Sequence, residues 1–174
     1  MEKSQGAVSR ALISGSIGGI ATALAAALAG KREEGSYAAP LNATSHIIWG
    51  DKAAHKDDAS LKYTFTGFLL NYAATIFWAL FYEKLFGRSG TVHTTTRGGA
   101  AKPKSPEKSV RRPILGAAAV TAGAYLIDYY LIPERFTPGF EKRLSGKSLA
   151  TIFGVLAVGL AARDLINAGT RRRK

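Results

Sequence analysis

The fold is decided first by residues 11–30, ALISGSIGGIATALAAALAG, which contain no charged side chain. A helix needs about 20 mostly apolar residues to cross the hydrocarbon core of a bilayer. Residues 63–82 form a second uncharged stretch of the same length. Two of the helices expected in this chain are therefore long enough to span a membrane.

Two further apolar stretches carry charges. Residues 113–132 begin and end beside prolines and contain one acid, Asp128, whereas residues 148–167 are interrupted by Arg163 and Asp164. At 174 residues the chain leaves no loop long enough for a second core. We expect one all-α membrane domain over residues 1–174, with four transmembrane helices in a bundle and a short interfacial helix in the first outer loop.

The net charge of +12 follows this pattern of spans. If both termini and the second loop share one side, that side has fourteen basic and three acidic residues, whereas the other has nine basic and seven acidic. Basic residues accumulate on the cytoplasmic side of membrane proteins. We therefore expect cytoplasmic N- and C-termini. The first span also resembles a signal peptide, with Ala27 to Ala29 as a cleavage site, but its apolar stretch is longer than usual and we expect it to be retained.

Small residues recur every four positions along the first span: Gly15, Gly19, Ala23 and Ala27. Membrane helices associate through close packing, and such patterns let two backbones approach. This face is expected to pack either within the chain or at the seam of a homodimer.

Polar side chains inside the spans are the candidate functional groups. Asn71 needs a partner in mid-membrane, either another helix or a substrate. Asp128, between Tyr125 and Tyr129, is a functional candidate because intramembrane acids are costly. The alternative is an interfacial acid paired with Arg135, Lys62 or a tyrosine hydroxyl.

The fourth span meets a charged pair near its cytoplasmic end. Arg163 is expected to reach the interface or to pair with Glu83 of the second span. Adjacent helical residues do not face each other, so Arg163 is not expected to contact Asp164.

The first outer loop contains the run PLNATSHIIWGD, residues 40–51. Pro40 suits a helix start, and Trp49 suits an anchor at the membrane surface, which together predict the interfacial helix. His46, Asp51, His55 and Asp57 offer an alternative metal site, although their spacing matches no known signature. No cofactor is expected, and no catalytic or phosphate-binding motif is present.

Residues 88–112 form a loop with seven basic residues and no apolar face, and Arg171 to Lys174 form a basic tail. We expect a flexible cytoplasmic loop, with both segments attracted to anionic lipid. Nucleic acid is not an expected partner because no stacking aromatic residues accompany these bases.

The run 40–51, followed by Thr64, Gly67 and the segment 77–83, resembles uncharacterised small four-helix proteins of the bacterial inner membrane. That resemblance implies an inner-membrane location and no activity.

Three functions fit these features. The first is a non-enzymatic bundle that acts by helix association, as a homodimer or an accessory subunit of a membrane complex. The second is a proton- or cation-coupled transport element that uses Asp128. The third is a membrane-surface metal site or enzyme that uses His46, Asp51 and His55.

Overall fold

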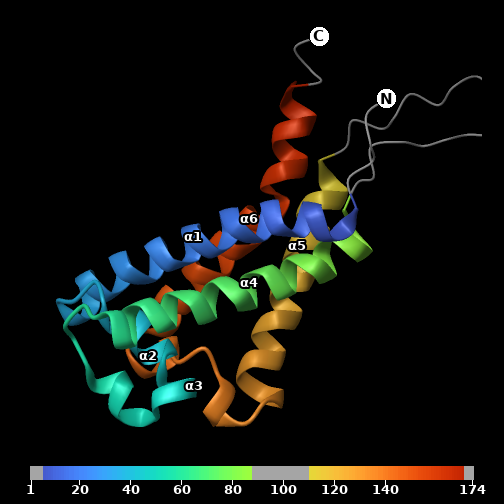
Figure 1. The fold of residues 1–174 in the computed structure, drawn as a ribbon. Helices are drawn as coiled ribbons and strands as arrows, with labels where there is room; N and C mark the ends of the chain where they lie inside the picture. Colours follow the sequence, from blue (N-terminus) through green and yellow to red (C-terminus); the bar gives the residue numbers. More distant parts are fainter. Residues whose placement is uncertain (1–5, 88–109, 171–174) are drawn as a thin grey trace, which may run out of the picture.

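The computed structural model describes residues 6–87 and 110–170. For residues 169 and 170 it describes the backbone alone. Every regular element in these ranges is helical (Figure 1). The basic tail and most of the basic loop, residues 171–174 and 88–109, lie outside the described part, as do the predictions made for them.

Four helices are long and apolar enough to cross a membrane, which confirms the expectation from the sequence. They are α1 (Ala7–Glu34), α4 (Thr66–Leu85) extended by the π-helical turn η2 (Leu61–Phe65), α5 (Arg111–Leu126) extended by the π-helical turn η3 (Ile127–Leu131), and α6 (Gly146–Thr170). Gly35 ends α1 in the left-handed conformation, with φ of 73°, which glycine adopts without a steric penalty.

Helix α1 lies at the centre of the contacts, since it packs along both α4 and α6. In Figure 1, α1 and α4 run beside each other, and α5 crosses them at a steep angle. Two glycines meet where α1 packs on α6: a Cβ on Gly159 would lie 2.5 Å from the Cα of Gly18. Close helix contact here therefore depends on small residues.

The segment between α1 and α4 folds into a cap over one end of the long helices. It contains α2 (Ala39–Thr44), α3 (His46–Trp49) and the 3₁₀ turn η1 (Asp51–His55). All six residues of α2 are buried, and a Cβ on Gly67 of α4 would lie 1.7 Å from the carbonyl oxygen of Leu41. Helix α2 thus has no free apolar face for a membrane surface, while Ile48 and Trp49 of α3 remain partly exposed. The physical reason is that α2 packs at once on α1, on α4 and on the turn η5 (Phe140–Lys142).

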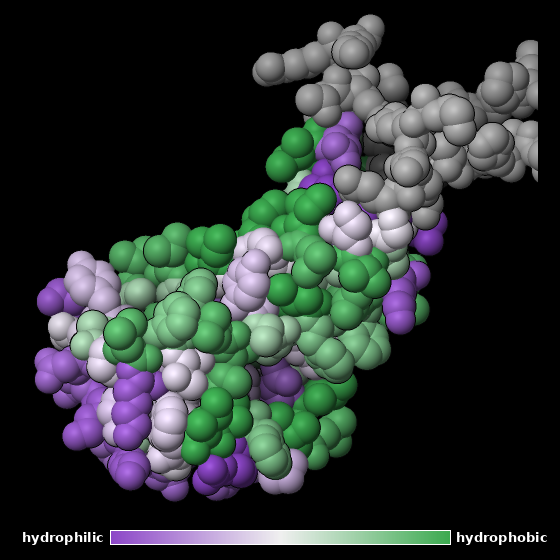
Figure 2. Space-filling view, in the orientation of Figure 1, coloured by the Kyte–Doolittle hydropathy of each residue, from purple (hydrophilic) through white to green (hydrophobic). Residues whose placement is uncertain are grey.

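The cap is closed by the segment between η3 and α6. It holds the 3₁₀ turns η4 (Glu134–Phe136) and η5 (Phe140–Lys142). Gly139, with φ of 82°, fits against the Ala43 carbonyl of α2. Figure 2 shows that hydrophilic residues gather at the end that holds α2 and α3, whereas hydrophobic residues cover most of the long helices.

Candidate functional site

A cavity of about 300 Å³ lies where the cap meets the long helices. Its walls come from α1, α2, α3, α4, η3, η4, η5 and α6. The wall is mainly apolar and aromatic, with a few polar side chains: Thr22, Thr44, Asn71, Thr75 and Asp128. Two sequence candidates from different helices, Asn71 and Asp128, therefore line the same space.

Asp128 lies in the π-helical turn at the end of α5. The Ile132 N–H donates to the Ile127 carbonyl at 3.1 Å, a five-residue spacing that widens the helix here. Such turns occur often at functional sites. Asp128 is half-buried and makes no hydrogen bond or ion pair with any residue that the structure describes.

The cations proposed as partners of Asp128 are engaged elsewhere. Arg135 donates from Nε to the Ile47 carbonyl at 3.1 Å, and the Lys62 ammonium lies 4.8 Å from the centre of the Trp49 ring. The interfacial pairing of Asp128 with these residues is not formed. Its carboxyl group lies on a largely apolar wall without a cationic partner among the described residues.

Glu141 of η5 is a neighbour of Asp128 that the sequence did not single out. One of its oxygens accepts a hydrogen bond from Thr137 Oγ1 at 2.6 Å, while Oε2 is buried without a hydrogen-bond partner among the described residues. The Tyr129 hydroxyl lies beside Glu141, close enough to interact with its carboxylate. No sequence signal distinguished Glu141 from the other acids of the outer loops, because only the fold of the cap brings it to η3.

Asn71 connects α4 to α1. Its Nδ2 donates to the Gly19 carbonyl and to Thr22 Oγ1, each at 3.1 Å, and Thr75 Oγ1 donates to the Asn71 carbonyl at 2.8 Å. Asn71 therefore has the interhelical partners that a mid-membrane amide needs. It lines the cavity as a fixed group.

The two tyrosines of the candidate site belong to an aromatic cluster beside the cavity. Tyr125 lies 5.1 Å from Tyr129 and 5.2 Å from Phe153, measured between ring centres. Phe153 itself is part of the cavity wall. The tyrosines thus support the wall that carries Asp128.

The small-residue face of α1 packs within the chain. Gly15, Gly19 and Ala23 are buried and Ala27 is half-buried. A Cβ on Gly15 would lie 2.8 Å from the Cα of Ile76, and one on Gly19 would lie 2.9 Å from the Tyr72 ring. This face is occupied by α4.

A polar cluster lies at the opposite end of the long helices from the cap. Arg10 Nε lies 2.9 Å from Glu83 Oε2, and both side chains are almost fully buried. Ser14 donates to Glu83 Oε1 at 3.2 Å, and Arg163 Nη1 lies 3.9 Å from Glu83 Oε2. Glu83 and Arg163 are thus near each other, but Arg10 is the closer partner of Glu83.

Asp164 completes this cluster by accepting a hydrogen bond from the Tyr82 hydroxyl at 3.0 Å. Arg163 Nη1 also lies 3.5 Å from Asp164 Oδ1. The expectation that these neighbours do not contact each other is wrong, because the long arginine side chain bends back toward the buried acid.

The outer-loop motif is distributed over the cap. Pro40 lies in the first turn of α2, Trp49 ends α3, and exposed Asp51 pairs with Lys142 at 3.1 Å. The Lys142 ammonium lowers the pKa of the Asp51 carboxyl by hydrogen bonding and by charge attraction. This pair joins the two cap segments.

His46 is buried, and both ring nitrogens face carbonyl oxygens, Nδ1 toward Ala43 at 2.8 Å and Nε2 toward Glu134 at 3.2 Å. No free ring nitrogen remains for a metal ion. Across the described residues, no group of three or more histidine and acidic side chains could hold one. His46, Asp51 and His55 do not converge, so the fold does not assemble the site that they suggested.

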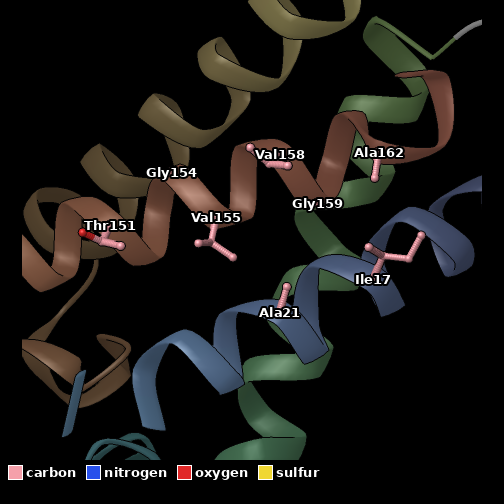
Figure 3. Close-up of a pocket in the computed structure, with 8 residues that line it drawn as sticks. All are labelled: Ile17, Ala21, Thr151, Gly154, Val155, Val158, Gly159 and Ala162. Carbon is pink, nitrogen blue, oxygen red and sulfur yellow. The ribbon is translucent and has the colours of Figure 1, made fainter. Parts of the chain in front are cut away.

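A second hollow, an open groove of about 470 Å³, runs between α1 and α6 (Figure 3). Ala21 and Val155 point toward each other across it. Gly154 is part of the lining, and no atom lies within 4 Å of its Cβ position. Thr151 is its one polar lining side chain. The groove suits apolar contacts.

Comparison of the chain with protein families, with curated proteins and with solved structures found no match.

Proposed function

We propose that this protein is a multi-pass membrane protein whose cavity binds a cation and takes part in its transfer across the bilayer. One observation carries the proposal: Asp128 lies on the wall of a cavity between helices long enough to span a membrane, without a cationic partner in the described residues.

The position of Asp128 matters because a charge inside the bilayer costs free energy. An ionised carboxylate within the bilayer costs about 2.5–3.5 kcal/mol at the centre of a span, and such groups usually pair or mark an ion or substrate path. Glu83 and Asp164 both have partners, whereas Asp128 has none within residues 6–87 and 110–170. A cation in the cavity would compensate the charge of Asp128.

The distribution of basic residues supports an orientation for this site. With the N- and C-termini cytoplasmic, as in a bacterial inner membrane, the cap lies outside and the cavity lies in the outer half of the protein. The basic loop and tail then face the cytoplasmic leaflet, where anionic lipid attracts them.

Flux measurements in reconstituted vesicles test this function. Vesicles with the native chain should take up protons or monovalent cations down an imposed gradient, and Asp128→Asn should reduce the rate at least tenfold. Asp51→Asn is the matched control, because Asp51 is an exposed acid outside the cavity. Equal rates for native and Asp128→Asn vesicles, with every cation offered, would refute the proposal.

The open groove between α1 and α6 favours helix association as a second function. Its small residues give another helix access to both backbones, and no described element fills it. The occupant would be a second copy of the chain or a membrane partner for which this chain is an accessory subunit.

Filling the groove tests this second function. Gly154→Leu should reduce the oligomer observed by single-molecule photobleaching in vesicles, or the yield of a co-purifying partner. Ala119→Leu, on the exposed side of α5, should change neither. An unchanged assembly in Gly154→Leu would rule out this groove as the contact.

A further inference from the structure

The residues that line the Asp128 cavity indicate which class of ligand fits it. Among the lining residues Asp128 is the single charged side chain, and the lining includes four aromatic rings, those of Trp78, Phe136, Phe140 and Phe153. These rings come from α4, η4, η5 and α6, so they surround the space from several sides. A ligand that fits must offer one positive charge and an apolar body.

The wall is poorly suited to a divalent metal ion. Ca²⁺ takes about six to eight oxygen ligands, and Mg²⁺ needs near-octahedral oxygen geometry. The cavity has one carboxylate, and the Asn71 amide is already bound to Gly19 and Thr22. The Thr75 and Thr44 hydroxyls donate to carbonyl oxygens of their own helices.

The size of the cavity also bears on the ligand. A volume of about 300 Å³ lies at the lower end of the range for small-molecule sites, about 300–1,000 Å³. A proton alone needs no such space. Aromatic faces attract organic cations, and this attraction strengthens when water is excluded.

From these observations we infer that the cavity binds an organic ammonium ion: a small molecule whose positive charge pairs with Asp128 and whose apolar body lies against Trp78, Phe136, Phe140 and Phe153. The inference rests on the proposed function, because it names the class of cation that the same site takes.

The test uses the full chain in nanodiscs of phosphatidylglycerol. The chain has two tryptophans, so Trp49→Phe leaves Trp78, on the cavity wall, as the single fluorescent reporter. Titration with benzyltrimethylammonium should give a saturable change in Trp78 fluorescence, whereas NaCl or KCl at equal ionic strength should not.

Variants in this background separate the charge from the apolar wall. Asp128→Asn should weaken benzyltrimethylammonium binding at least tenfold, and Phe136→Leu, which removes one ring from a partly exposed position, should weaken it severalfold. Asp51→Asn should leave the affinity unchanged. Neopentylbenzene, which has the same shape without the charge, should bind native and Asp128→Asn protein equally.

Two results would overturn the inference: no saturable response to benzyltrimethylammonium in the folded native background, or equal affinity in Asp128→Asn. If that result accompanied Asp128-dependent flux in vesicles, the ligand class would be wrong and the proposed function would stand. If flux were also independent of Asp128, both would fail.

The ammonium group could belong to a free amine or to a lipid headgroup, and a second set of nanodiscs distinguishes these sources. Weaker apparent binding of benzyltrimethylammonium in phosphatidylethanolamine nanodiscs would indicate competition by the headgroup. Equal binding in both lipids would indicate a free amine. Either result supports an ammonium site.

Discussion

Gly18 and Gly159 are the residues that let α1 and α6 meet, whereas Gly154, five residues before Gly159 on α6, faces open space. The three glycines look alike in the sequence, since all belong to apolar spans. Their different surroundings make them a matched set for testing the helix arrangement.

Gly159→Ala should lower the free energy of unfolding by about 1–3 kcal/mol, because its Cβ would lie 2.5 Å from the Gly18 backbone and a packed core resists extra volume. Gly154→Ala should not destabilise the protein, since no atom lies within 4 Å of its Cβ. Unfolding in mixed detergent micelles measures both. Equal stability of the two variants would contradict the α1–α6 contact.

Glu83 is the residue whose removal should cost most. Its side chain is buried between Arg10, Ser14 and Arg163. Breaking a buried ion pair by removing one partner costs about 3–5 kcal/mol. Glu83→Ala should therefore destabilise the protein by about that amount in the same assay, whereas Asp58→Asn, on the exposed cap surface, should remain near the native value. A loss below 1 kcal/mol for Glu83→Ala would contradict the buried pair.

At the scale of elements, the cap is held by contacts between segments that are far apart in the chain. Asn42 of α2 is its central group, because Nδ2 donates to the Lys56 and Asp58 carbonyls at 2.8 and 3.0 Å and Oδ1 accepts from Thr64 at 2.6 Å. Asn42 thus fixes both the segment that follows η1 and the start of the second span to α2.

Asn42→Ala should loosen the cap, because it removes three part-buried hydrogen bonds, each of which contributes about 0.5–1.5 kcal/mol. We expect faster hydrogen exchange over residues 50–64 and little change in α6. Unchanged exchange in that segment would show that Asn42 does not hold the cap.

The Asp51–Lys142 pair predicts a pH dependence of the same element. The pKa of Asp51 is lowered in the folded protein, so the pair stabilises the cap above the ordinary pKa of an aspartate, and this contribution is lost as pH falls through the lowered value. The difference in melting temperature between native and Asp51→Asn protein should be small at neutral pH and should vanish in strong acid. A difference that grew on acidification would contradict the assignment.

Some of these elements could be predicted from the sequence and others could not. The four long helices could be predicted because the length of an apolar stretch alone identifies them. The burial of α2 and the position of Glu141 could not, since both depend on how two loops pack over the helix ends. Asp128 stood out as an acid in a span, but the cavity beside it and the absence of a described cationic partner required the fold.

At the scale of the whole molecule, the proposals depend on one orientation in the membrane. The chain has no cysteine, so single cysteines can report it. In intact cells, an impermeant maleimide should label a cysteine at exposed Lys52 of the cap and should not label one at Lys84, near the opposite end of α4. Labelling of Lys84→Cys instead would place the cap on the cytoplasmic side and contradict the proposed orientation.

The central claim is that Asp128 makes an accessible, cation-selective cavity within the membrane. A cysteine at Ala74, on the cavity wall, should react faster with a cationic methanethiosulfonate than with an anionic one, and Asp128→Asn should remove that preference. A cysteine at Ala119, on the exposed side of α5, should show no preference that depends on Asp128. The account predicts a cation-to-anion rate ratio at Ala74→Cys that falls at least tenfold with Asp128→Asn. A ratio unchanged by Asp128→Asn, or no reaction with either reagent, would contradict it.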